Sequence, residues 1–220
     1  MFLGHHAVAF AAKRVAPRTS LGMLMGAALL LDLVWPVLVL TGVESFRVEP
    51  GNTAFTPLAF DSYPFSHSLL TSLGIAVLLA IAYWSFARYQ PGAWMVGLGV
   101  FSHWVLDFIS HRPDLPLAPG GEARVGLGLW NSIPATLAVE LVLFGVAVWI
   151  YLRTTRPREK AGRVAPWILV GFLLATYFAN VFGPPPPSAH AVSWVALAVW
   201  LLPFWAAWMD RRREVPAPKA

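Results

Sequence analysis

Six long apolar segments, separated by short polar stretches, dominate the pattern of this chain. Each has about the 20 residues that a helix needs to cross the hydrocarbon core of a bilayer. The stretches between them are rich in proline, glycine or charged residues, which favour loops. The pattern therefore predicts six transmembrane helices, over residues 21–41, 67–88, 93–111, 129–152, 164–182 and 189–209.

The first 15 residues are also apolar, but they are too few to span a membrane. His5 and His6 interrupt them, and Lys13 and Arg14 follow the apolar part, which is not the order found in a cleaved signal peptide. We expect a short N-terminal helix that is half-inserted or lies at the membrane interface. The predicted fold is thus all-α: a polytopic membrane helical bundle that forms one integral membrane domain, residues 1–220.

The composition agrees with this class. The chain is 57% hydrophobic and only 12% charged, with a mean hydropathy of +0.61. Soluble domains carry about 25% charged residues. Because the chain has no cysteine, disulfides and thiolate metal sites are excluded, and any metal ion would have to be bound by histidine, carboxylate or backbone oxygen.

Lysine and arginine residues predict the orientation, because loops that stay in the cytoplasm carry an excess of them. With six spans, the four most basic segments all fall on one side of the membrane: residues 13–18, 88, 153–163 and 211–213. Both termini are therefore predicted to be cytoplasmic. Topology then explains the net charge of +5, and no nucleic-acid partner is expected.

The third segment carries the strongest chemical signal. His103, Asp107 and His111 are four residues apart, so on a helix they lie on one face. Ionisable side chains at membrane depth are costly, and their presence favours a functional site. Since zinc accepts neutral imidazole and carboxylate ligands, these residues are candidate metal ligands. The alternative is a hydrogen-bonded His103–Asp107 pair that joins helices, with His111 an interfacial residue.

Polar residues on other segments are candidates for the same pocket. His67 opens the second span and is the natural third ligand, while Ser66 before it fits a helix cap. Asp32, near the middle of the first span, is a candidate ligand or general base, or else a hydrogen-bonding partner for a neighbouring helix. His5 could reach the site if the N-terminal helix enters the membrane. Glu140, on the fourth span, is a weaker candidate for a base or proton carrier.

Several short motifs give the chain a resemblance to a known family. They are Gly4-His5, Leu31-Asp32 with Trp35-Pro36, Ser66-His67-Ser68-Leu69-Leu70 and Ser102-His103-Trp104-Val105-Leu106-Asp107. In order and spacing, over about residues 1–155, the chain resembles the YdjM-type membrane-bound metal-dependent hydrolases. Residues 156–220 hold two further spans outside this resemblance. The resemblance implies a location in the inner (plasma) membrane of a bacterium. It also implies a metal site formed by His5, Asp32, His67, His103 and Asp107.

The leading hypothesis is a membrane-embedded metal-dependent hydrolase that acts on a lipid or lipid-linked ester or phosphoester near the outer leaflet. Its cofactor would be a divalent metal ion, with zinc favoured, and Asp32 or His111 would be the catalytic base. One alternative is a non-catalytic membrane subunit, bound to a membrane-protein partner, a pigment assembly or a second copy of itself. Another is a small proton-coupled transporter, although the sequence has no inverted repeat.

Overall fold

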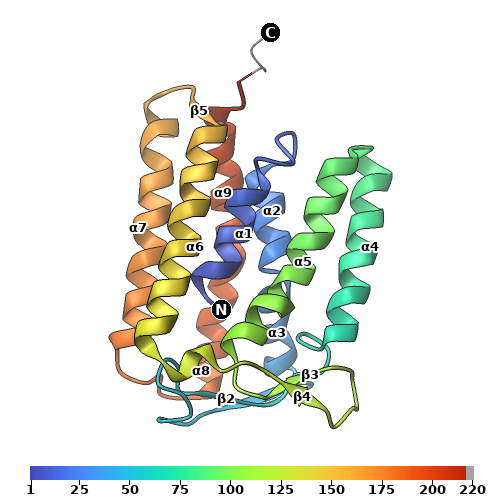
Figure 1. Ribbon diagram of the computed structural model, residues 1–220, viewed down its shortest axis with the longest axis vertical. Coiled ribbons are helices and arrows are strands. Elements are labelled where there is room, and N and C mark those ends of the chain that lie inside the picture. Colours follow the sequence, from blue (N-terminus) through green and yellow to red (C-terminus); the bar gives the residue numbers. More distant parts are fainter. Residues whose placement is uncertain (217–220) are drawn as a thin grey trace.

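A computed structural model of the chain, described over residues 1–216, is an all-α bundle whose long helices run side by side (Figure 1). This confirms the fold class that the apolar pattern predicts. The helices are α1 (Leu3–Ala12), α2 (Leu21–Ala28), α3 (Leu30–Leu40), α4 (Leu69–Ala87), α5 (Gln90–Ser110), η1 (Leu129–Asn131), α6 (Ile133–Thr154), α7 (Lys160–Phe182), α8 (Ala189–Ala196), η2 (Leu197–Trp200) and α9 (Leu201–Arg211). Short strands pair antiparallel as β1 (Ser45–Val48) with β2 (Leu58–Ser62), β3 (Leu115–Pro116) with β4 (Arg124–Val125), and β5 (Arg156–Pro157) with β6 (Arg213–Glu214).

Five helices in the described chain are long and apolar enough to cross a membrane: α4, α5, α6, α7 and the continuous stretch from α8 to α9. Helices α2 and α3 reach the same length together, but they are bent by 52° at the break around Leu29. If this bent pair is one span, the number is six, as the sequence predicts. The chain thus has the architecture of an integral membrane protein.

The two ends of the bundle differ in structure and in charge (Figure 1). One end, called the basic end below, contains the α1–α2 loop, the α4–α5 turn and the β5–β6 pair, and it gathers the four basic segments identified in the sequence. The opposite end, called the hairpin end, contains β1 to β4 and the start of α8. The helices therefore sort the basic loops to one end.

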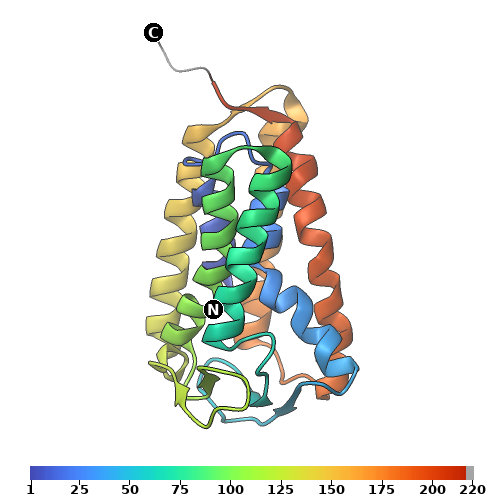
Figure 2. The same ribbon diagram turned by 90° about the vertical axis from the view of Figure 1, so that its right-hand side faces the viewer.

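Helix α1 lies inside the bundle, and its amino terminus is about halfway along the bundle's length (Figure 1, Figure 2). Eight of its ten residues are buried, and it packs against α2, α5 and α6. Glu140 on α6 accepts hydrogen bonds from the backbone N–H groups of Leu3 (2.5 Å) and Gly4 (3.2 Å), which are the free donors of a helix N-terminus. Helix α1 is therefore buried between other helices of the bundle, and Glu140 has a structural role as the cap of its N-terminus.

A buried polar network ties the end of α1 to α9 near the basic end. Lys13 Nζ donates to Asp210 Oδ2 at 2.6 Å and to the carbonyl of Thr19 at 2.9 Å. Asp210 also accepts hydrogen bonds from the Tyr151 hydroxyl and the Leu21 N–H, both at 3.0 Å. We call these residues the Lys13–Asp210 network. Its charges are paired and hydrogen bonded, as buried charges must be if they are not to destabilise the fold.

The segment 43–66, interpreted from the sequence as a polar loop, contains the β1–β2 hairpin. Phe46 and Phe60 pack their rings on Trp35 of α3, with centroid distances of 4.7 Å and 5.8 Å. The solvent side carries the exposed ion pair of Arg47 with Asp61. Strands of four and five residues show too little alternation to be separated from a loop by pattern alone.

Candidate metal centre

Four polar side chains from three parts of the chain converge inside the bundle: His103 and Asp107 on α5, Asp32 on α3, and His67 just before α4. His103 Nε2 lies 3.2 Å from Asp107 Oδ2 and 3.6 Å from Asp32 Oδ1. His67 Nε2 lies 3.7 Å and 3.6 Å from the same two oxygens. We call these four residues the His–Asp cluster.

The cluster is buried on all sides but one. The side chains of His67, His103 and Asp107 are at most 5% exposed, whereas that of Asp32 keeps 40% of its surface. Asp32 lies three residues after the break at Leu29 between α2 and α3, on the bent first span. Asp32 is therefore the member of the cluster that reaches the surface of the fold.

A close contact between α5 and α2 orients His103. A Cβ at Gly99, one turn earlier on α5, would lie 3.4 Å from the Cβ of Ala27, so the two helices are nearly in backbone contact. This brings His103 Nδ1 to 2.8 Å from the carbonyl of Ala28. A carbonyl can only accept, so Nδ1 carries a proton. Nε2, which faces the carboxylates, has no hydrogen-bond partner among residues 1–216.

Ser66 and Glu44 orient His67 in a similar way. Ser66 Oγ donates to Glu44 Oε2 at 2.6 Å and lies 2.7 Å from His67 Nδ1. The hydroxyl has a single proton, which it gives to the Glu44 carboxylate, so it must accept from the Nδ1–H of His67. In its neutral form, His67 therefore presents the lone pair of Nε2 to Asp32 and Asp107.

The prediction that Ser66 is a helix cap is wrong. The cap of α4 is Ser68, whose side chain accepts from the N–H of Thr71. Glu44 also accepts the N–H groups of Phe65 and Ser66 at 2.8 Å, which fixes the backbone next to His67. The sequence analysis missed Glu44, because no local pattern links it to a serine 22 residues further along the chain.

His5 approaches Asp107 from α1. Its Nε2 lies 3.1 Å from Asp107 Oδ1, and the amino group of Met1 contacts the same oxygen. The His5 ring is stacked on that of His103, with centroids 3.6 Å apart and planes within 2°. Two positive charges this close would repel, so at least one of the two rings is neutral. Asp107 thus directs Oδ1 toward His5 and Oδ2 toward His67 and His103.

Two sets of three residues have ligand atoms within 4.8 Å of one another, as a shared metal ion requires: Asp32 with His67 and His103, and His5 with His103 and Asp107. In a tetrahedral zinc site with bonds of about 2.0–2.2 Å, ligand atoms are about 3.3–3.6 Å apart. The four N···O distances in the His–Asp cluster, from 3.2 to 3.7 Å, are close to this value. The donor set therefore fits a divalent ion such as zinc.

His111 lies outside both sets, in a separate polar group at the hairpin end. Its Nδ1 is 3.0 Å from Asp114 Oδ1, and the Tyr63 hydroxyl donates to the same oxygen at 2.8 Å. Burial, together with the Asp114 carboxylate, raises the pKa of Tyr63 well above its ordinary value. The predicted role of His111 as a base thus rests on the sequence alone.

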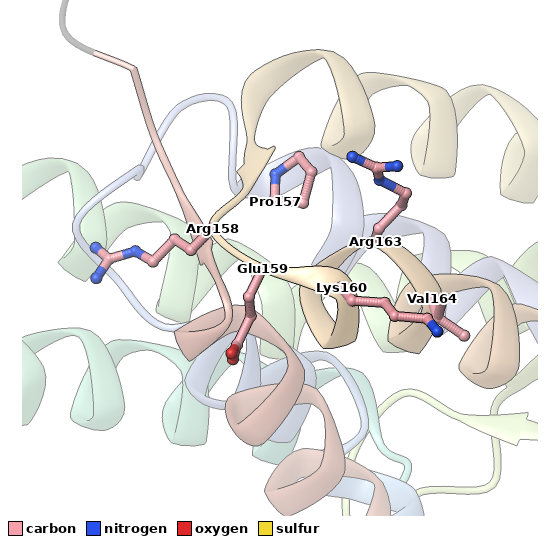
Figure 3. A pocket seen from close by; sticks show the side chains of 6 residues that line it. All are labelled: Pro157, Arg158, Glu159, Lys160, Arg163 and Val164. Carbon is pink, nitrogen blue, oxygen red and sulfur yellow. The ribbon is translucent and has the colours of Figure 1, made fainter.

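A shallow hollow of about 430 Å³ lies at the basic end, in the loop between α6 and α7 (Figure 3). The side chains of Arg158 and Arg163 point away from each other there. Its lining residues are Pro157, Arg158, Glu159, Lys160, Arg163 and Val164. None of these described residues is a histidine, so the hollow has no ligand set comparable to that of the His–Asp cluster.

Comparison with known proteins gave no matching family model, no matching curated protein and no matching solved structure. The resemblance to the YdjM-type hydrolases therefore remains a prediction from the motifs.

Proposed function

We propose that this chain is a membrane-embedded, metal-dependent hydrolase that acts on a lipid or lipid-linked ester or phosphoester. The observation that carries the proposal is the arrangement of the His–Asp cluster. Two imidazoles that donate their Nδ1–H groups elsewhere direct Nε2 at two carboxylates, at 3.2 to 3.7 Å. A lone pair and a carboxylate repel one another at this distance unless a proton or a metal cation lies between them. A divalent ion meets that need, and zinc is favoured by nitrogen and oxygen ligands.

His67, His103 and Asp107 would hold the ion. When bound, the ion would polarise the scissile group and lower the pKa of a water molecule to about 7. Asp32 is the exposed member of the cluster, so it would accept the proton of the attacking water and pass it to solvent.

The residues around the ligands would fix their orientation. His5 donates to Oδ1 of Asp107, which leaves Oδ2 for the ion. Ser66 and Glu44 hold His67 in the tautomer that offers Nε2. Such partners of metal ligands commonly set metal affinity.

The proposed orientation follows from the basic loops, which favour the cytoplasm. The basic end would face the cytoplasm of a bacterial cell, and the hairpin end would face outward. His103 and Asp107 lie in the half of α5 that ends at the hairpin end, so the cluster would lie at the depth of the outer leaflet. This depth favours a lipid as the substrate, hydrolysed at a bond near its headgroup.

The test is the metal content of the purified protein, measured by mass spectrometry after growth in zinc-supplemented medium. We expect about one ion per chain in the wild type and almost none in His103→Ala or Asp107→Ala. The matched control is His190→Ala, because His190 is an exposed histidine whose ring contacts Trp194 rather than the cluster. It should keep its full metal content.

A folded, monodisperse wild-type protein without metal would overturn the proposal. In that case both imidazoles would carry a second proton and pair with the two carboxylates, giving a neutral cluster. The chain would then be the non-catalytic membrane subunit considered above.

A further inference from the structure

A large apolar cavity of about 880 Å³ lies between α7 and the stretch from α8 to α9, and it extends toward the hairpin end. It is lined by residues 50–51 and 53–58, by the four prolines 184–187, and by Leu202 and Trp205 of α9. All of its lining residues are uncharged. The cavity therefore suits a hydrocarbon ligand and offers nothing to neutralise a charged one.

The dimensions of the cavity match one leaflet. Ala191 and Trp205 both line it, and 14 residues of helix between them span about 21 Å. Half of a bilayer, including its headgroup region, is about 20–22 Å thick. Its two walls belong to segments that are long and apolar enough to cross a membrane. A ligand in this cavity would thus lie at the depth of acyl chains.

Phe2 connects the cavity with the His–Asp cluster. Its side chain lines the cavity and packs on the ring of Tyr177, with centroids 5.7 Å apart. On the other side, its carbonyl accepts from His6 Nδ1 at 3.0 Å, and the amino group of Met1 contacts Asp107. A residue that lines the cavity is therefore next in sequence to one that touches the cluster.

We infer that this cavity binds one acyl chain of a membrane lipid, with the headgroup at the hairpin end. The apolar lining takes the chain, and Thr53 and Asn180, which also line the cavity, are available to uncharged polar groups near the headgroup. The identification of this lipid as the substrate rests on the proposed function. The binding of an acyl chain in the cavity does not depend on that proposal.

The experiment uses the full chain, purified in mild detergent and incubated with dipalmitoyl phosphatidylglycerol, with retained lipid counted by native mass spectrometry. Ala179→Phe and Ala198→Phe each fill the cavity from a different wall, and both positions are exposed, so the larger side chain meets no protein core. Ala175→Phe is the matched control, because it is an equally exposed alanine of α7 outside the lining. We expect a severalfold loss of retained lipid in both cavity variants and none in the control.

Equal lipid retention by the cavity variants and the Ala175→Phe control would overturn the inference. Equal retention of dihexanoyl phosphatidylglycerol would also overturn it, because each buried methylene should add to the affinity. Metal content is measured in the same samples. Protein that contains metal but shows no cavity effect refutes only this inference, while metal-free protein that loses lipid in the cavity variants refutes only the proposed hydrolase.

Discussion

The Lys13–Asp210 network and the His–Asp cluster are both buried polar groups in an apolar bundle, yet their hydrogen bonding differs. In the network, the ammonium of Lys13 faces acceptors only, and Asp210 accepts from three donors. In the cluster, two imidazole Nε2 atoms face two carboxylates, and His103 Nε2 has no hydrogen-bond partner within the described chain. Burial of charge alone therefore does not indicate function in this protein. The balance of donors and acceptors separates a structural group from one that calls for a ligand.

The largest expected effect comes from breaking the network. Lys13→Met leaves the Asp210 carboxylate buried without its cation, so the free energy of unfolding should fall by about 3–5 kcal/mol. Unfolding in mixed micelles of rising denaturant content measures this loss. Arg14→Met, at the exposed neighbouring position, is the control and should change stability by less than about 0.5 kcal/mol. Similar losses in the two variants would show that the network is not the structural element described above.

The second effect concerns the cluster and depends on metal. Zinc at about 100 times its dissociation constant should raise the free energy of unfolding of the wild type by about 2.7 kcal/mol, and a chelator should remove this gain. His103→Ala should show no gain.

The same measurement in chelator sharpens the contrast between the two regions. Asp32→Asn removes one of the facing acceptors, so it should leave the stability of metal-free protein unchanged or slightly raised. Asp210→Asn removes a satisfied charge and should lower it. If both substitutions destabilise metal-free protein equally, the cluster is a paired structural group like the network.

The third effect is on metal affinity alone. Ser66→Ala removes the acceptor of the His67 Nδ1–H, so zinc affinity should fall by about 10–100-fold, as it does when other partners of metal ligands are lost. Zinc titration with a competing chromophoric chelator measures it, and Ser66→Thr, which keeps the hydroxyl, should restore most of the affinity.

The matched control for Ser66→Ala is Ser68→Ala, which removes the cap of α4. This should cost about 1 kcal/mol of stability and leave zinc affinity unchanged. Equal zinc affinity in all three serine variants would contradict the role assigned to Ser66.

The sequence predicted those features that depend on local pattern. Long apolar windows give the spans, and the spacing of four residues places His103 and Asp107 on one face of α5. A single polar residue in such a window, such as Asp32, can also be recognised from the local sequence. Composition could not show which polar residues pair across the bundle.

The features that the sequence did not predict are long-range contacts. Lys13 meets Asp210 across 197 residues, and Glu44 meets Ser66 across 22. The local sequence offers an ordinary explanation for each of these residues. Lys13 and Asp210 are charges that flank apolar segments, Glu44 lies in a loop, and Ser66 precedes a helix like a cap. The bend near Leu29 is also tertiary in origin, since the segment reads as one apolar run.

The smallest effect concerns Tyr63, whose hydroxyl bonds to Asp114 in a group where each polar atom named has a partner. Tyr63→Phe should cost about 1 kcal/mol at neutral pH, the usual net value of one hydrogen bond. By the argument drawn from the two larger groups, this one is structural. The substitution should therefore leave zinc content unchanged.

The environment of Tyr63 also predicts how the free energy of unfolding changes with pH. Burial and Asp114 raise the pKa of Tyr63 in the folded chain, so above about pH 10 the unfolded chain loses the phenol proton first. The unfolded state is then favoured, and this contribution to stability, fully present below about pH 10, is lost as pH rises. The free energy of unfolding should fall more steeply above about pH 10 in the wild type than in Tyr63→Phe. Parallel curves would mean that Tyr63 ionises freely in the folded chain. A loss of zinc in Tyr63→Phe would mean that this polar group, including His111, takes part in ligand binding and is not merely structural.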